Sequence, residues 1–231
     1  FCFLMKALRA VNCASKSVPK LGLGVFSYFL ECIIMSSIKF SSASKMPCFS
    51  WSLEAMTTCA GAVDIVTGAV VAACEICYAR GGLYHMPSVK ALRQHNKEDW
   101  KRKEFVDEFI VKLDNSRYFR WFDSGDCYTT KLAWKMYAIM KATPWCKHWF
   151  PTRNHKFDKY KVVLDAMALL PNVVVRFSSD SITGSVVDGA TTSTIVPYVE
   201  TPISFLGKSE VCYAYDRGGK CGDCRSCWDK D

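Results

Sequence analysis

The chain has 231 residues, of which 50% are hydrophobic and 23% are charged. This length and composition allow one full hydrophobic core and exclude an intrinsically disordered protein. The formal net charge of +8 is compatible with an acidic partner such as nucleic acid, but charge alone does not indicate one.

Residues 1–34 mix basic side chains with an apolar run from Val25 to Met35. This run is too short to span a bilayer, so no membrane association is expected. We predict that residues 1–34 are an N-terminal extension, either an additional strand and turn or sequence upstream of a start at Met35 or Met46. Its cysteines are expected to be packing or incidental thiols: Cys2, Cys13 and Cys32.

The rest of the chain alternates between strand and helix patterns. Strands are predicted at Cys48–Leu53, Arg117–Phe122, His148–Thr152, Val173–Ser178 and Thr191–Val199. Helices are predicted at Tyr84–Leu113, as one or two helices, and at Thr129–Lys141 and Phe157–Leu170. This alternation is typical of a parallel sheet with crossover helices. The predicted fold is therefore α/β, a partial (β/α) barrel with a parallel sheet over residues 35–206, followed by a Cys-rich C-terminal tail over 207–231.

Thirteen cysteines are many for this chain, and an odd number excludes complete pairing within it. Their clustering favours metal binding in a reducing cytoplasm over a disulfide scaffold. A first group comprises Cys59, Cys74 and Cys77, with a small-residue loop between the first two that could wrap closely around an inorganic core. Cys74 and Cys77 are expected to begin a helical turn, whose N–H groups would favour thiolates.

A second group lies in the tail, where the spacing is CxxCxxC with one cysteine upstream: Cys212, Cys221, Cys224 and Cys227. This spacing resembles the bacterial ferredoxin run. A structural zinc site is the alternative, although zinc sites usually separate two CxxC pairs. The sequence predicts one or two iron–sulfur clusters, and a single site that draws ligands from both groups also stays open.

Polar residues follow three of the predicted strands. In parallel α/β folds the carboxyl ends of the strands carry the site, so we expect these residues and the Cys59 loop to meet at one mouth. The candidate catalytic residues are Asp123, Asp126, Arg153 and Asp180, and the candidate cofactor-binding residues are Ser124 and Gly125.

Other roles remain open for these residues. Asp123 and Asp126 also fit a turn and a helix cap before Thr129. An Arg after a strand, such as Arg153, is more often a surface salt-bridge partner, and Asp180 has the same ambiguity.

A basic stretch at residues 97–104 includes Trp100, which makes nucleic-acid binding a rival function. Acidic residues interrupt this stretch, and a solvated helix face explains it better.

Cys127 and Cys146 are expected to be buried apolar residues. The histidines have no metal-binding spacing and are assigned no chemistry: His85, His95, His148 and His155.

Several segments together resemble the phage gene product 88 family. The matching segments are Ser44-Lys-Met-Pro-Cys-Phe-Ser-Trp-Ser-Leu53, Thr58-Cys-Ala-Gly61, Cys74-Glu-Ile-Cys-Tyr-Ala79, Phe119-Arg-Trp-Phe-Asp-Ser-Gly-Asp126, Thr152-Arg153 and the Cys-rich tail. Where that family commonly has Cys-Pro-Gly, this chain has Cys59-Ala60-Gly61, which loses loop stiffness and keeps the thiol. The resemblance, over about residues 36–228, implies a phage or prophage origin, the cytoplasm of an infected or lysogenic bacterium, and iron–sulfur chemistry.

The layout also resembles a partial barrel of the radical S-adenosylmethionine kind, in which a cluster loop follows the first strand. The CxxxCxxC loop of that superfamily is absent here. A three-cysteine site would still leave one iron open to a ligand such as S-adenosylmethionine. We expect redox or radical chemistry on an unidentified small or macromolecular substrate. The alternative is a zinc-stabilised module that binds nucleic acid or a host protein without catalysis.

Overall fold

The computed structural model describes residues 37–196, 211–214 and 216–230. The predicted extension over residues 1–34 lies outside these residues. So do the last residues of the predicted strand Thr191–Val199 and the predicted boundary between residues 206 and 207.

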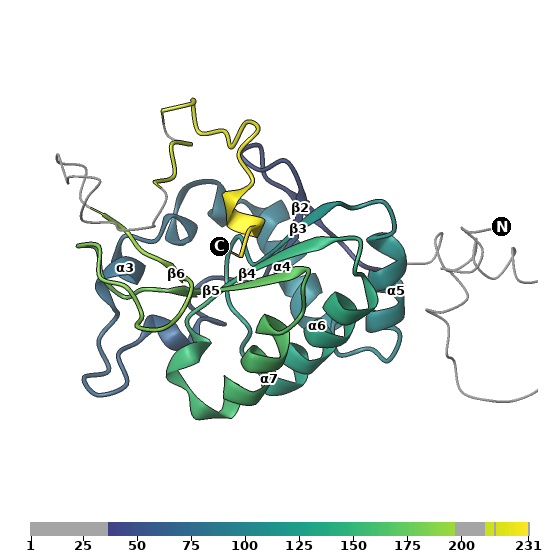
Figure 1. Cartoon of the computed structure of the whole chain (residues 1–231), viewed down its shortest axis with the longest axis horizontal. Coiled ribbons are helices and arrows are strands. Elements are labelled where there is room, and N and C mark those ends of the chain that lie inside the picture. Colours follow the sequence, from purple (N-terminus) through teal and green to yellow (C-terminus); the bar gives the residue numbers. More distant parts are fainter. Residues whose placement is uncertain (1–36, 197–210, 215, 231) are drawn as a thin grey trace, which may run out of the picture.

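Within the described residues, six strands form one sheet in the order β1-β2-β3-β4-β5-β6 (Figure 1). Their bounds are Ser41–Ser42, Phe49–Trp51, Tyr118–Trp121, Lys147–Thr152, Val173–Ser178 and Thr192–Ser193. β1 pairs with β2 in antiparallel fashion, and all other neighbouring pairs are parallel. The predicted α/β fold with a parallel sheet is thus confirmed. Closure is not, because the sheet stays open within the described residues and a partial barrel is not established.

In the part of the chain that the structure describes, four helices of eight residues or more connect the strands: α4 Pro87–Asp99, α5 Phe105–Lys112, α6 Thr130–Ala142 and α7 Asp158–Ala168. The predicted helical segment Tyr84–Leu113 therefore contains two helices. Pro87 suits the first turn of α4, where its missing N–H costs nothing. Among the described residues, no helix is long and apolar enough to cross a membrane.

The N-cap of α6 is Thr129, whose hydroxyl accepts a hydrogen bond from the backbone N–H of Leu132 at 3.1 Å. The helix cap is therefore supplied by Thr129 itself. The capping role left open for Asp123 and Asp126 was wrong.

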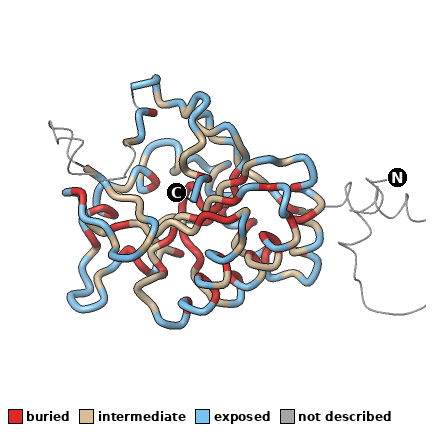
Figure 2. The backbone as a smooth tube through the Cα atoms, viewed as in Figure 1, coloured by how far each residue is buried: buried red, intermediate tan, exposed pale blue. Residues whose placement is uncertain are grey.

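The main core lies between one face of the sheet and α5, α6 and α7. Alternate strand residues such as Trp51 and Trp121 point into this core, and Phe109 of α5 stacks on Trp121 with ring centroids 5.0 Å apart. Sequential strand order with right-handed crossovers places connecting helices on the same face of a sheet. Figure 2 shows the buried residues concentrated along the strands and the adjoining helices.

The opposite face of the sheet, which we call the open face, is partly covered by the tail (residues 211–214 and 216–230) (Figure 1). A short 3-10 helix, η6 Ser226–Trp228, brings Trp228 onto this face. The Trp228 ring packs against Tyr118 of β3 and Trp149 of β4, at centroid distances of 5.3 and 5.7 Å. Its Nε1–H donates to the Phe119 carbonyl at 2.9 Å. The tail is thus attached to the sheet by a buried aromatic side chain.

Candidate functional site

The residues that follow β2, β3, β4 and β5 lie along the carboxyl edge of the sheet. The Leu53 N–H donates to the Ser124 carbonyl at 3.1 Å, which joins the segments after β2 and β3. Arg153, after β4, forms an ion pair with Asp180, after β5, at 3.2 Å. The strand ends singled out in the sequence are therefore neighbours, while their chemical roles stay predictions.

The loop that carries Cys59, Cys74 and Cys77 is fastened across this edge. The Lys156 Nζ donates to the Gly61 carbonyl at 3.0 Å, and the Ala73 N–H donates to the Asp180 carbonyl at 3.0 Å. The Tyr78 hydroxyl donates to the Asp123 carbonyl at 2.6 Å. Contacts with the segments after β3, β4 and β5 thus fix the loop over the mouth predicted from the sequence.

Gly61 brings the loop close to the segment after β4. A Cβ added at this glycine would lie 2.5 Å from the Cβ of Arg153 and 2.8 Å from its carbonyl oxygen. Gly125 also has no room for a side chain, because an added Cβ would lie 2.7 Å from Thr58 Oγ1. Its φ of +75° is in addition a conformation that favours glycine. At Gly125 the absence of a side chain therefore meets a packing and a backbone requirement, and the residue need not bind a cofactor.

The three loop thiols are electrostatic neighbours of one another. The pKa of Cys59 is raised to about 12, mainly by burial and in smaller part by Asp126, Cys74 and Cys77. Burial also raises the pKa of Cys74, while Arg153 acts in the opposite direction. Cys74 lies in α3 (Ala72–Glu75), which is a single helical turn, and burial outweighs any stabilisation of its thiolate by that turn.

Within the described residues, the loop cysteines Cys59, Cys74 and Cys77 are free thiols. Within the same residues, no three His, Cys, Asp or Glu side chains are placed so that they could hold a metal ion. The predicted metal roles of Cys59, Cys74 and Cys77 therefore remain predictions. The loop brings these thiols into one neighbourhood without a ready-made site for a single ion.

Asp126 is buried and joins the segments after β3 and β4. Its carboxylate accepts hydrogen bonds from Thr152 Oγ1 at 2.9 Å, the Arg153 N–H at 2.9 Å and the Cys127 N–H at 2.7 Å. The Asn154 side-chain amide donates a further bond at 3.3 Å. Burial raises the pKa of Asp126 to about 6, and these hydrogen bonds act in the opposite direction. The carboxylate oxygens are thus occupied within the protein.

Asp123 is paired with Arg93 of α4. The Arg93 Nη2 lies 3.0 Å from Asp123 Oδ1, and the side chains are only 5% and 6% exposed. The same guanidinium donates to Ser124 Oγ and Ser41 Oγ, both at 2.9 Å. Sequence reasoning missed Arg93, because it lies in a polar helix whose buried side is also polar, with Asn96 fully buried. The spacing of Arg93 and Asn96 was the available signal.

Arg153 and Asp180 have the salt-bridge partners that the sequence left as their alternative role. Lys156 also forms an ion pair with Asp180. These side chains are 22% exposed for Arg153 and 37% exposed for Asp180. Both charged groups therefore reach the surface of the mouth, and both are already paired there.

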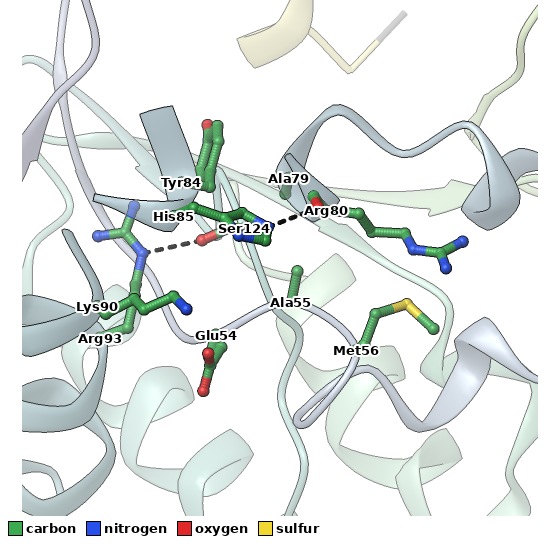
Figure 3. Close-up of a pocket in the computed structure, with 10 residues that line it drawn as sticks. All are labelled: Glu54, Ala55, Met56, Ala79, Arg80, Tyr84, His85, Lys90, Arg93 and Ser124. Carbon is green, nitrogen blue, oxygen red and sulfur yellow. Dashed lines mark hydrogen bonds between the residues drawn. The ribbon is translucent and has the colours of Figure 1, made fainter. Parts of the chain in front are cut away.

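A pocket of about 200 Å³ lies beside the thiol loop (Figure 3). Its lining residues are Glu54, Ala55, Met56, Ala79, Arg80, Tyr84, His85, Lys90, Arg93 and Ser124. The Arg80 Nη1 donates to the Cys74 carbonyl at 3.3 Å, which connects the pocket to the loop. No hydrogen bond or ion pair engages the side chains of Glu54 and Lys90 in the part of the chain that the structure describes. No sequence motif indicated this pocket.

The tail thiols form a second neighbourhood, on the open face. The pKa of Cys227 is raised to about 11, mainly by burial and in smaller part by Cys212 and Cys221, while Arg176 and Arg120 act in the opposite direction. The Cys221 Sγ lies 3.9 Å from the Met46 sulfur. Cys224, the remaining predicted ligand, is exposed.

The two cysteine groups lie on different surfaces of the sheet, one at its carboxyl edge and one on its open face. The single shared site that the sequence left open would therefore have to draw its ligands from two different surfaces of the sheet. Cys48 also belongs to the second neighbourhood, because Arg120, Cys221 and Arg225 all act on its pKa, which burial raises to about 12. No motif or spacing in the sequence grouped Cys48 with the tail.

The remaining sequence predictions concern residues away from the mouth. Cys127 and Cys146 are fully buried, as predicted.

In the basic stretch at residues 97–104, Trp100 is buried and its Nε1–H donates to the Tyr128 hydroxyl at 2.8 Å. Arg102 pairs with Asp99 at 2.6 Å and with Glu108 at 2.8 Å. The stretch therefore presents neither a free aromatic ring nor a run of unpaired basic side chains.

The described residues define an α/β protein with an open, mostly parallel sheet, a cysteine-containing loop over its carboxyl edge and a cysteine-rich tail on its open face. The chain belongs to the phage gene product 88 family, since the model of that family, described as "Gene product 88", matches residues 33–230. Comparison with curated proteins and with solved structures gives no match.

Proposed function

We propose that this protein is an iron–sulfur protein in which Cys59, Cys74 and Cys77 bind a cluster at the carboxyl edge of the sheet. The observation that carries the proposal is the grouping of three free thiols in a loop fastened to the segments after β3, β4 and β5. In parallel α/β folds this edge is the usual place for chemistry. The reducing cytoplasm of an infected or lysogenic bacterium would keep such thiols free.

A cluster suits this loop better than a single ion. The thiolates of an iron–sulfur cluster bind different iron atoms, so they need not converge on one metal position. The loop thiols are neighbours, yet no three metal-binding side chains of the described residues are placed to hold one ion. Zinc bound by three or four thiolates would require that convergence.

Charge around the thiols also supports the proposal. Arg153 and Lys156 both favour the thiolate form of Cys74, although burial raises its pKa overall. Because the ligands must lose their protons, cluster binding would release protons and would stabilise the folded loop. The two cations would then offset part of the negative charge of the bound thiolates.

The pocket beside the loop is the proposed place for a substrate. When bound, a cluster held by three thiolates supplies redox or radical chemistry through an iron that lacks a fourth protein ligand, and S-adenosylmethionine is the second cofactor we propose. Glu54 and Lys90 carry opposite charges in the pocket and have no partners among the described residues, so they are available to orient a small ligand. An open, mostly parallel sheet that curves toward a partial barrel would support a substrate site at its carboxyl edge.

Cysteine variants test the loop site directly. After anaerobic reconstitution with iron and sulfide, Cys77→Ala should lose the cluster of the loop and should keep less iron and sulfide than the wild-type protein. Cys146→Ala is the matched control, because it removes a buried thiol that belongs to neither predicted metal group. Equal iron and sulfide contents in Cys77→Ala and Cys146→Ala would contradict the proposal. Zinc without sulfide in the wild-type protein would favour the zinc-stabilised binding module.

A further inference from the structure

The open face of the sheet contains buried polar atoms without hydrogen-bond partners in the described residues. They are Ser50 Oγ, Arg120 Nε, Trp149 Nε1 and Arg176 Nε. Ser50, Arg120 and Trp149 are direct neighbours across β2, β3 and β4, so they share one face. Each atom carries a hydrogen that it can donate. Buried donors of this kind are normally paired, so several on one face call for an acceptor.

Two of these donors belong to arginines that lack an acidic partner. Neither Arg120 nor Arg176 forms an ion pair with a described residue. The Arg120 guanidinium lies 4.5 Å from the ring centroid of Trp149, and its Nη2 donates to the Tyr78 hydroxyl at 3.2 Å. Asp123, which also acts on Arg120, is already engaged by Arg93. The open face thus has uncompensated positive charge, which favours an anion.

The tail places sulfur atoms over these same arginines. The Arg176 Nη2 donates to the Ser226 carbonyl at 3.2 Å, directly beside Cys227. The Arg120 Nη1 contacts the Met46 sulfur at 3.8 Å, and that sulfur lies 3.9 Å from Cys221 Sγ. Both arginines therefore face the region in which the tail thiols gather.

We propose that Arg120 and Arg176 hold an anionic metal–thiolate centre of the tail against the open face, by donating their unpaired Nε–H groups to its sulfur atoms and balancing its charge. The inference rests on the proposed iron–sulfur function and extends it from the loop to the tail, because it requires the tail to bind a cluster through Cys212, Cys221, Cys224 and Cys227. An iron–sulfur cluster bound by four thiolates carries a net negative charge. Hydrogen bonds to the sulfurs then tune both the affinity and the reduction potential.

The test uses the full chain with Cys77→Ala in the background, which leaves the tail as the only proposed centre. Arg120→Met and Arg176→Met remove the N–H donors and the charge while keeping side chains of similar length. Arg117→Met is the matched control, because Arg117 is exposed just before β3. Metal affinity is measured by chelator competition, and the midpoint potential is measured by redox titration of the reconstituted protein.

Arg120→Met and Arg176→Met should each weaken metal retention by about 10- to 100-fold, the usual effect of removing an outer-shell partner. The midpoint potential should shift in the negative direction, because lost positive charge and lost N–H donors disfavour the more negative, reduced state. Arg120→Lys keeps the charge and loses Nε, so it should lie between Arg120→Met and Arg117→Met.

The outcomes separate the two claims. Wild-type protein that retains no metal would overturn the proposed function and this inference with it. Metal retention with Arg120→Met and Arg176→Met indistinguishable from Arg117→Met would overturn the inference alone. Lower thermal stability of the metal-free variants, with unchanged affinity and potential, would assign the arginines a purely structural role and would also overturn it. Binding of inorganic phosphate to the metal-free wild-type protein, without any effect on metal retention, would likewise contradict the inference.

Discussion

At the scale of single residues, His148 is a buried group whose charge state depends on the fold. Its Nδ1 accepts from the Trp121 Nε1–H at 3.3 Å, and its Nε2–H donates to the Thr143 hydroxyl oxygen at 2.8 Å, because that hydroxyl already donates to the Ile139 carbonyl. Both ring nitrogens are therefore used by the neutral form. Burial lowers the pKa of His148 to about 3.

Because the unfolded chain binds a proton at His148 near pH 6.5 and the folded chain does not, the contribution of this residue to stability should fall as pH drops. The expected loss is about 1.4 kcal/mol per pH unit below pH 6.5, continuing toward pH 3. Urea unfolding at pH 7 and pH 5 measures it. Asp126, with its pKa raised to about 6, acts in the opposite sense below pH 6. The test therefore compares how steeply the free energy of unfolding changes with pH in the wild type and in His148→Gln. Identical slopes would contradict the assignment.

Gly61 offers a second test at this scale. Gly61→Ala would force an added Cβ into Arg153, so we expect it to lower the free energy of unfolding by about 1–3 kcal/mol and to loosen the thiol loop. Gly81→Ala is the control, because no heavy atom lies within 4 Å of its added Cβ. Thermal unfolding and the rate of Cys59 alkylation measure the two effects. Unchanged alkylation in Gly61→Ala would show that the loop does not depend on this contact.

At the scale of elements, the ion pair between Arg93 and Asp123 attaches α4 to the segment after β3. Arg93→Met would leave the Asp123 carboxylate buried and unpaired, so we expect a loss of about 3–5 kcal/mol in the free energy of unfolding. Adding Asp123→Asn should restore part of that loss. Lys101→Met removes an exposed pair with Glu98 and should change stability by less than about 1 kcal/mol. Equal effects of Arg93→Met and Lys101→Met in chemical denaturation would contradict this account.

Most elements could be predicted because their signals are local. The β-branched segment Val173–Ser178 coincides with β5, and the apolar periodicity of Thr129–Lys141 marks α6 to within a residue at each end. β2 lies within the predicted strand Cys48–Leu53, but β1 and its pairing with β2 could not be predicted in the same way. β1 has only two residues, both serine, and it exists through its antiparallel pairing with β2.

At the scale of the whole molecule, the tail is held on the open face mainly by Trp228. Trp228→Ala would remove a ring that is 3% exposed and its hydrogen bond to the Phe119 carbonyl, and it should cost about 3–5 kcal/mol in stability or in tail docking. Limited trypsin digestion should then cut first after Arg217 or Lys220. Tyr213→Ala is the control, because that side chain is 48% exposed. Equal digestion of the two variants would show that Trp228 does not anchor the tail.

The candidate site was predictable only in part, because some of its contacts join residues that are far apart in the sequence. Strand order predicts that polar residues after parallel strands meet at one edge, and Arg153 and Asp180 do so. The partners that neutralise them come from distant positions, as Arg93 does for Asp123, and residue spacing does not encode such contacts. The position of the tail over Arg120 and Arg176 was also unpredictable, because it depends on contacts between the tail and strands that are distant from it in the sequence.

The most direct test of the central claim is metal and acid-labile sulfide analysis of anaerobically purified wild-type protein, with an absorption spectrum recorded before and after dithionite. We expect iron and sulfide in comparable amounts and a visible absorption band that bleaches on reduction. Zinc without sulfide, or protein that takes up neither iron nor sulfide on reconstitution, would contradict the assignment of the Cys59 loop and the tail as iron–sulfur sites.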